Sequence, residues 1–266
     1  MVNFEYKEHY TVDDFEKIIA LLRSEDGCPW DREQTHESIR RNLLEEAYEV
    51  VEAIDEKNPL HLREELGDLL MQVIFHARIE EEQGSFDLNA VVDAACKKLI
   101  LRHPHVFGNE QVENSLDVLR KWDEIKRVEK SQELFSDTLD AVAKSLPALW
   151  RAEKVQDKAK KAGVDFLDIS GAMDKLREEV LELETAVRDG AGVEEELGDV
   201  LFSVVNSARF LGIDPEIALH SASDKFSRRF RAIEAEARLE GRNLDEMSLD
   251  DMEALYQQVK KREGKQ

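Results

Sequence analysis

The chain carries the same acidic pattern twice, and this duplication constrains its fold more than any other feature. The pattern is Glu-Glu-x-x-Glu followed by Glu-Leu-Gly-Asp, with 15 intervening residues in the first copy and 13 in the second. It occupies residues 45–68 in the first half and 178–199 in the second. Because the repeated unit is much longer than the units of solenoid proteins, we expect two copies of one domain.

The match between the two halves continues beyond the acidic residues. Each pattern is followed by a Lys and an Arg four positions apart, and then by an aromatic residue. These residues are Lys98, Arg102 and Trp122 in the first copy and Lys225, Arg229 and Tyr256 in the second. We therefore divide the chain into domains at 1–130 and 146–266, with the polar segment 131–145 as a connector.

Helical periodicity runs through both copies. Only 12 Gly and 5 Pro interrupt the 266 residues, and apolar residues recur at three- and four-residue spacing. No segment has the pattern of a strand, and 42% apolar residues suffice for a packed core. The sequence predicts an all-α fold of tandem helical bundles. Its helices are expected near 12–23, 36–56, 60–83, 87–102, 115–130, 138–161, 171–188, 193–211, 214–240 and 248–262.

The net charge of −22 argues against nucleic-acid and membrane-surface partners, since so negative a surface repels phosphate backbones and anionic lipids. The first five residues lack the basic and then apolar run of a secretory signal, so we expect a soluble, cytoplasmic protein. Cys28 and Cys96 have no metal or redox spacing and are interpreted as ordinary thiols, with Cys96 in the core.

The repeated carboxylates indicate a metal site. Glu46 and Glu49 lie about 60° apart on one helical face, beside an apolar stripe, and Glu65 and Asp68 have the same separation on the next helix. Two such helices side by side would bring four carboxylates together, which is unfavourable unless a divalent cation neutralises them. An all-oxygen ligand set suits Mg²⁺, with Mn²⁺ as a substitute. The same arrangement recurs in the second copy at Glu179, Glu182, Glu196 and Asp199.

A glycine directly precedes each of the aspartates, at Gly67 and Gly198. A glycine inside a helix costs about 1 kcal/mol relative to alanine, so its presence at the same place in both copies suggests a geometric reason. We expect these glycines to let helix backbones approach closely, either around the site or simply for tight packing.

These patterns resemble the MazG family of nucleoside triphosphate pyrophosphohydrolases. The resemblance spans nearly the whole chain and includes residues 27–31 (Gly-Cys-Pro-Trp-Asp) and 102–108 (Arg-His-Pro-His-Val-Phe-Gly). It implies an all-α fold in which four-helix units are completed by dimerisation. It also implies Mg²⁺-dependent hydrolysis of ribo- and deoxynucleoside triphosphates to monophosphate and pyrophosphate, with broad base specificity.

The resemblance also assigns roles to individual residues. The eight carboxylates named above match the family's metal ligands. The nucleotide contacts are expected at Lys175, Leu176, Arg177, Glu178, Glu179, Gly192, Val193, Glu194, Glu195, Asp199, Lys225, Arg229 and Tyr256, and in the first copy at Lys98, Arg102 and Trp122. Gly192 and Tyr256 depart from the Lys and Trp that close relatives carry. Glu178 and Glu45, the first Glu of each pair, are candidates to orient or deprotonate water, although a solvated helix face is an equally good interpretation.

Two alternatives remain open at this point. The chain could be a regulatory or scaffold protein that holds Mg²⁺-nucleotide without hydrolysing it, or an enzyme with only one active half. If one half dominates, we expect it to be the second, because Lys225, Arg229 and Tyr256 match the family's nucleotide contacts more closely.

Overall fold

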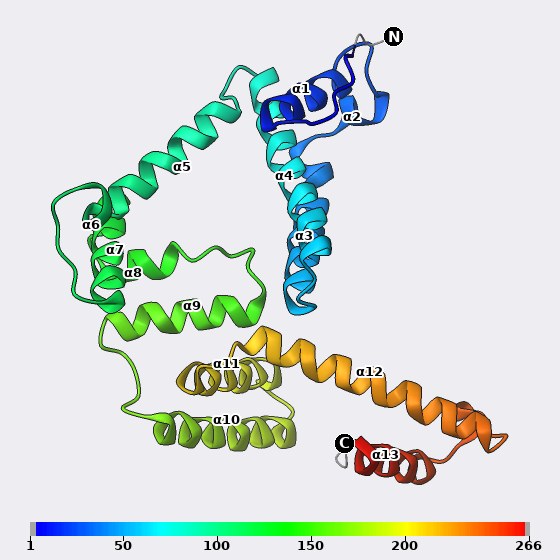
Figure 1. Cartoon of the computed structure of the whole chain (residues 1–266). Helices are drawn as coiled ribbons and strands as arrows, with labels where there is room; N and C mark the ends of the chain where they lie inside the picture. Colours follow the sequence, from blue (N-terminus) through cyan, green and yellow to red (C-terminus); the bar gives the residue numbers. More distant parts are fainter. Residues whose placement is uncertain (1–3, 264–266) are drawn as a thin grey trace. The chain divides into compact units, whose positions relative to one another are not determined.

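The computed structural model describes residues 4–263, and within them all regular structure is helical (Figure 1). The predicted all-α fold is confirmed. The elements are α1 Val12–Leu22, α2 Pro29–Glu33, α3 His36–Asp55, α4 Pro59–Glu82, α5 Leu88–Arg102, α6 Pro104–Phe107, α7 Ser115–Glu129, α8 Phe135–Asp140, α9 Ala148–Lys161, α10 Ile169–Asp189, α11 Val193–Leu211, α12 Pro215–Leu239, η1 Leu244–Glu246 and α13 Leu249–Glu263.

Local capping explains where the site-bearing helices begin. Helix α4 starts after Asn58, whose side chain accepts hydrogen bonds from the backbone N–H groups of Leu60 and His61, while Pro59 occupies the first turn. Asp168 caps α10 and Asp214 caps α12 in the same way. Each cap fixes the residue at which its helix begins.

The predicted helix 138–161 is wrong in its first part. The structure has a short helix α8 and then α9, which begins only at Ala148. Pro147 has an extended backbone, with ψ of 141°, and cannot donate the hydrogen bond that a continuous helix would need. The short elements α2, α6 and η1 were not predicted, because three to five residues are too few to show helical periodicity.

The chain divides into two compact units that meet between Lys126 and Arg127, within α7. The predicted connector 131–145 contains α8 and belongs to the second unit. In the first unit α4 packs against α1, α3 and α5. The core of that unit contains Ile19, Ile39, Ile74, Phe75, Ala77, Ile79 and Leu88.

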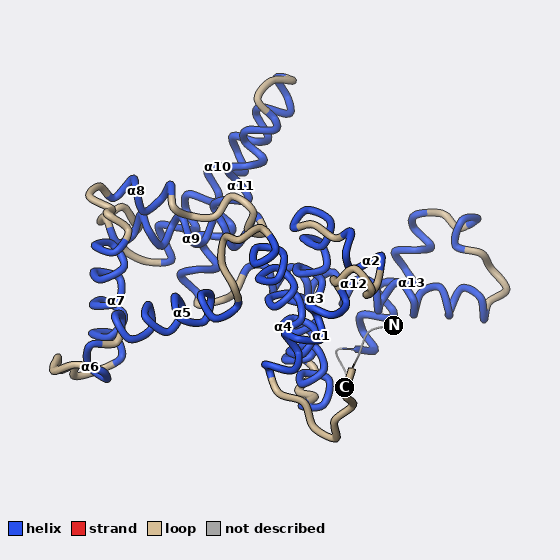
Figure 2. Tube along the Cα trace, turned by 90° about the horizontal axis from the view of Figure 1, so that it is seen from above, coloured by secondary structure: helices blue, strands red, loops and turns tan. Residues whose placement is uncertain are grey.

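In the second unit, α10 and α11 form an antiparallel hairpin, with α9 packed against α11 (Figure 1). The turn between α10 and α11 uses Gly190 and Gly192 at φ of 70° and 73°, where a side chain would be strained. Helices α12 and α13 form a second hairpin around Ile233, Ala237, Leu255 and Val259. Figure 2 shows helices joined by loops and turns, with no strand among the described residues.

Three expectations about packing are corrected or refined by the structure. Cys96 is exposed rather than in the core. A Cβ atom added to Gly67 or Gly198 would meet nothing within 4 Å, so neither glycine serves close packing inside the described chain. The apolar stripe of α4 is only partly buried, since Ala77 is in the core whereas Leu66 and Leu70 are exposed.

Within the described helices, none is long and apolar enough to cross a membrane.

Candidate metal and nucleotide site

The first acidic cluster lies between α3 and α4, which pack closely against each other. One carboxylate oxygen from each of Glu46, Glu49 and Glu65 lies within 4.8 Å of the other two. Glu65 is buried, Glu46 is half-buried and Glu49 is exposed, so the cluster opens to solvent on one side. Asp68, the fourth predicted ligand, is outside this group of three, although its charge contributes to the raised pKa of Glu46.

Burial and like charge both disfavour the ionised carboxylates of this cluster. Burial is the largest cause that raises the pKa of Glu46, and the charges of Asp68, Glu49 and Glu65 raise it further. The pKa of Glu65 is also raised, first by burial and then by Glu49. Burial and repulsion both oppose charged carboxylates at this place, and a bound divalent cation would offset both effects.

One charged neighbour of Glu65 was missed by the sequence analysis. The Nε2 atom of His61 lies 3.1 Å from Oε1 of Glu65, and its Nδ1 atom lies 2.8 Å from Oε2 of Glu56. His61 precedes Glu65 by four residues, one helical turn, and that spacing was the available signal.

The second acidic cluster repeats the first between α10 and α11. Oxygens of Glu179, Glu196 and Asp199 lie within 4.8 Å of one another, and Glu179 is buried. Glu182 adjoins this group: a hydrogen bond with Glu179 is the largest cause that raises its pKa, followed by burial. Three of the four predicted carboxylates therefore form this group, from two helices joined by a tight turn, and Glu182 is hydrogen-bonded to one of them.

Lys175 neutralises part of the second cluster. Its Nζ atom lies 2.8 Å from Oε1 of Glu179 and 2.7 Å from Oε1 of Glu178. The hydrogen bonds that Lys175 donates to these two carboxylates raise its pKa, so the ammonium stays charged. In the first copy, Glu45 is paired with Arg41 at 2.8 Å on the exposed face of α3.

The remaining predicted contacts of the second cluster follow the turn between its helices. Lys175 and Leu176 are half-buried on α10, and Arg177 is exposed and paired with Asp174 at 2.5 Å. Gly192 precedes α11, and the exposed residues Val193, Glu194 and Glu195 form the first turn of that helix.

The predicted arginine and aromatic residues contact each other in both units. Nη1 of Arg229 donates a hydrogen bond to the Tyr256 hydroxyl at 3.0 Å, and its guanidinium lies 5.5 Å from the ring centroid. In the first unit the guanidinium of Arg102 lies 5.7 Å from the centroid of Trp122. Arg229 and Tyr256 are 27 positions apart in the sequence, and Arg102 and Trp122 are 20 apart. Before the structure, only their recurrence in both copies had connected them. Lys225 and Lys98 are exposed, one turn before each arginine.

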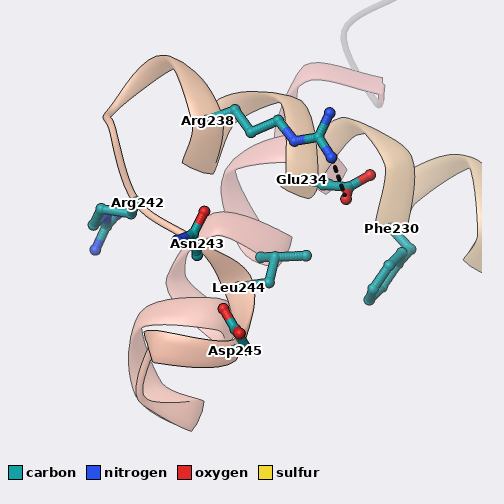
Figure 3. A pocket seen from close by; sticks show the side chains of 7 residues that line it. All are labelled: Phe230, Glu234, Arg238, Arg242, Asn243, Leu244 and Asp245. Carbon is teal, nitrogen blue, oxygen red and sulfur yellow. Dashed lines mark hydrogen bonds and ion pairs between the residues drawn. The ribbon is translucent and has the colours of Figure 1, made fainter.

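Figure 3 shows a pocket of the second unit that lies elsewhere, between the last turns of α12 and η1. Its lining includes Glu234 and Arg238, which are paired at 3.1 Å, and the ring of Phe230. None of the predicted site residues lines it.

Comparison with known proteins identifies the family. A model of the MazG nucleotide pyrophosphohydrolase domain matches the chain twice, at residues 34–107 and 169–233. The nucleoside triphosphate pyrophosphohydrolase of Escherichia coli K12 is 45% identical over 251 residues, which cover 92% of this chain and 95% of that protein. The Thermotoga maritima protein named nucleoside triphosphate pyrophosphohydrolase/pyrophosphatase MazG is 42% identical over 249 residues, with the same coverage of 92% and 95%.

The chain therefore belongs to the MazG family of nucleotide pyrophosphohydrolases. The resemblance drawn from the acidic patterns is confirmed, as is the enzyme class it implied, a hydrolase that acts on diphosphate bonds. Each family match contains one of the two acidic clusters.

Proposed function

We propose that this chain hydrolyses ribo- and deoxynucleoside triphosphates between the α- and β-phosphates, releasing monophosphate and pyrophosphate with little selection for the base. The observation that carries the proposal is the cluster of Glu179, Glu196 and Asp199 in a chain of this family. The names of its relatives in Escherichia coli and Thermotoga maritima support the same activity. The net charge of −22 disfavours nucleic acid and anionic membranes as partners, whereas a small nucleotide in the cytoplasm can bind when a divalent metal offsets its charge.

The donor set of each cluster fits Mg²⁺, with Mn²⁺ as a substitute. Carboxylate oxygens are the ligands that hard divalent cations prefer, and in each cluster three of them lie within 4.8 Å. Glu46, Glu49, Glu65 and Asp68 would hold the ion in the first unit, and Glu179, Glu182, Glu196 and Asp199 in the second. When bound, the ion supplies positive charge that offsets the polyphosphate and stabilises the departing pyrophosphate.

The chain's own residues would bind and orient the nucleotide. Lys225 and Arg229 supply positive charge for phosphate oxygens, and the Tyr256 ring, held by Arg229, offers a flat apolar surface for a base. A face of this kind stacks on any base, which supports broad specificity. Glu178, or Glu45 in the first copy, would accept a proton from the attacking water.

The second unit is proposed to carry the main activity. In this unit Lys175 is paired with the buried carboxylate of Glu179, and Arg229 is hydrogen-bonded to Tyr256. The two alternatives are retained as outcomes of the test: one active half, or a protein that holds Mg²⁺-nucleotide without hydrolysing it.

A homodimer is also proposed. The helix pairs that carry the clusters expose large apolar side chains that a single described unit leaves in solvent. These include Leu44 (54% exposed) and Leu66 (49%) in the first unit and Leu181 (61%) and Leu201 (50%) in the second. A second copy that completes each helical unit would bury them. Light scattering after size-exclusion chromatography tests this, and a monomeric mass would contradict it.

Pyrophosphate release tests the proposed function. Glu179→Gln and Glu46→Gln are nearly isosteric changes at matched positions, assayed with several nucleoside triphosphates and Mg²⁺. We expect Glu179→Gln to abolish release and Glu46→Gln to retain most of it. The reverse result would move the activity to the first unit. Nucleotide binding without release by the unmutated chain would support the regulatory interpretation.

A further inference from the structure

Lys175 bridges two carboxylates of the second unit that the proposed reaction needs. Its Nζ atom lies 2.8 Å from Oε1 of Glu179, a proposed metal ligand, and 2.7 Å from Oε1 of Glu178, the candidate to accept a proton from water. The two glutamates follow Lys175 by three and four positions on α10, so one ammonium reaches both. A single side chain therefore engages a metal ligand and the candidate base at the same time.

The contact with Glu179 competes with a metal ion for the same oxygen. The Glu179 side chain is only 7% exposed, so water and salt screen its surroundings weakly. A divalent ion lies about 2.1 Å from a carboxylate oxygen, so an ion on Oε1 of Glu179 would lie within about 5 Å of the Lys175 ammonium. Positive charges at that distance in a buried site repel each other strongly. The ammonium in this position therefore disfavours the ion.

The Lys175 side chain is able to turn away from the cluster. It is 36% exposed, and both carboxylates that it contacts lie on its own helix. A lysine carries its charge on a flexible four-carbon stem, so its ammonium can turn without movement of the backbone. A triphosphate bound to an ion at Glu179 brings several anionic oxygens close to this ammonium, and these attract it away from the two glutamates.

The first cluster shows that the carboxylates gather without a lysine at this place. The position that matches Lys175 is occupied by Asn42. Glu46, Glu49 and Glu65 nevertheless lie within 4.8 Å of one another. Assembly of a cluster does not require the lysine, so its contact with Glu179 calls for a role beyond holding α10 and α11 together.

We infer that Lys175 is an internal counter-cation that weakens binding of free metal at the second centre until a nucleotide draws the ammonium away. Its departure leaves Glu179 to the ion and Glu178 to the attacking water. Metal and nucleotide therefore bind the second centre together, and the centre becomes competent only when substrate is present. The inference rests on the proposed function, because it uses the roles given there to Glu179 and Glu178.

Two affinities measured on the full chain test the inference. Glu46→Gln and Glu65→Gln disable the first centre, and calorimetric titration then measures binding of Mn²⁺ alone and of the Mn²⁺ complex of α,β-imido-dATP, which resists hydrolysis. We expect Lys175→Met to raise the affinity for Mn²⁺ alone about 10-fold, because a repulsive charge is removed. The same variant should lower the affinity for the analogue about 10-fold, because a charged contact with phosphate is lost.

Two further variants separate this effect from a general change of charge. Lys175→Arg keeps the positive charge and should leave the affinity for Mn²⁺ alone within about 2-fold of the value for the chain with Lys175. Arg188→Met removes one positive charge from the exposed last turn of α10, away from the cluster, and should change neither affinity.

The outcomes distinguish this inference from the proposed function. An unchanged or lower affinity for Mn²⁺ alone in Lys175→Met overturns the role of Lys175 and leaves the activity untouched. An equal gain in Arg188→Met also overturns it, because net charge alone then explains the effect. Failure of the second centre with Lys175 to bind the Mn²⁺ complex of the analogue contradicts the inference and the function together. Opposite shifts of the two affinities, in a chain that releases no pyrophosphate, support the inference and contradict the function.

Discussion

The two acidic clusters are built from the same four repeat positions, but a different three lie closest together: Glu46, Glu49 and Glu65 in the first, and Glu179, Glu196 and Asp199 in the second. Their charged neighbours also differ: His61 links Glu56 to Glu65 in the first unit, and Lys175 links Glu178 to Glu179 in the second. A buried, like-charged group needs compensation whether or not a cation is bound, and each copy provides it differently. Duplication has therefore preserved the carboxylates, whereas the charged partner one helical turn before a buried glutamate differs between the copies.

The largest expected effect separates the two clusters by their roles in hydrolysis. Glu196→Gln removes a charged oxygen from the second cluster and should lower kcat by about 100-fold or more, because the metal is lost or misplaced. Glu65→Gln, at the matched position of the first cluster, should change kcat less than about 2-fold. Steady-state pyrophosphate release measures both. Equal losses would show that the two centres act together.

A smaller effect is expected where the arginines contact their aromatic partners. Arg229→Lys keeps the charge but loses both the hydrogen bond to Tyr256 and the planar contact with its ring. We expect KM for nucleoside triphosphate to rise about 5- to 30-fold, in keeping with the 1 to 2 kcal/mol of such contacts. The matched change Arg102→Lys, which removes the contact with Trp122, should leave KM unchanged.

The helix glycines provide a comparison in which both units should behave alike. Gly67→Ala and Gly198→Ala add a methyl group that meets nothing within 4 Å, so each should stabilise its helix by about 0.5–1 kcal/mol. Chemical denaturation measures the gain. A loss of stability in either variant would show that the open space beside that glycine is filled in solution, for instance by a second copy.

The smallest expected effect concerns pH, and compares one arginine–carboxylate pair from each unit. Arg23 binds Glu82 at 2.8 Å in the first unit, and Arg209 binds Asp165 in the second. Burial raises the pKa of each carboxyl, but hydrogen bonds from Arg23 and Arg78 to Glu82, and from Arg209 to Asp165, lower it overall.

The sign of the pH effect follows from these lowered values. Stabilisation by each pair is present above the unfolded pKa, near pH 4, and is lost as pH falls through the lower folded pKa. Glu82→Gln and Asp165→Asn should therefore lower Tm at pH 7 and lose most of that effect at pH 3. Thermal melts at the two pH values measure it. An equal drop in Tm at both would assign the pairs a packing role only.

Much of the helical fold was predictable because it depends on local spacing. Thr11, Asn58 and Asp214 mark helix starts through caps that involve only the next few residues. The break at Pro147 was missed although its cause is local, since the apolar spacing on both sides of it favoured one helix. The core position expected for Cys96 was wrong because periodicity identifies an apolar face but not what covers it.

The sequence by itself predicted that carboxylates of two consecutive helices meet in each copy, because helical spacing puts the paired acids of each helix on one face. Which three lie closest together was decided by the structure: Glu46, Glu49 and Glu65 in the first unit, and Glu179, Glu196 and Asp199 in the second. Only the tertiary structure decided what lies around them. Three features depend on how separate helices end and pack. They are the ion pair of Glu56 with His61, the hydrogen bond of Arg229 to Tyr256 and the open space beside Gly198. Such contacts join side chains across different helices, and no period along one helix encodes them.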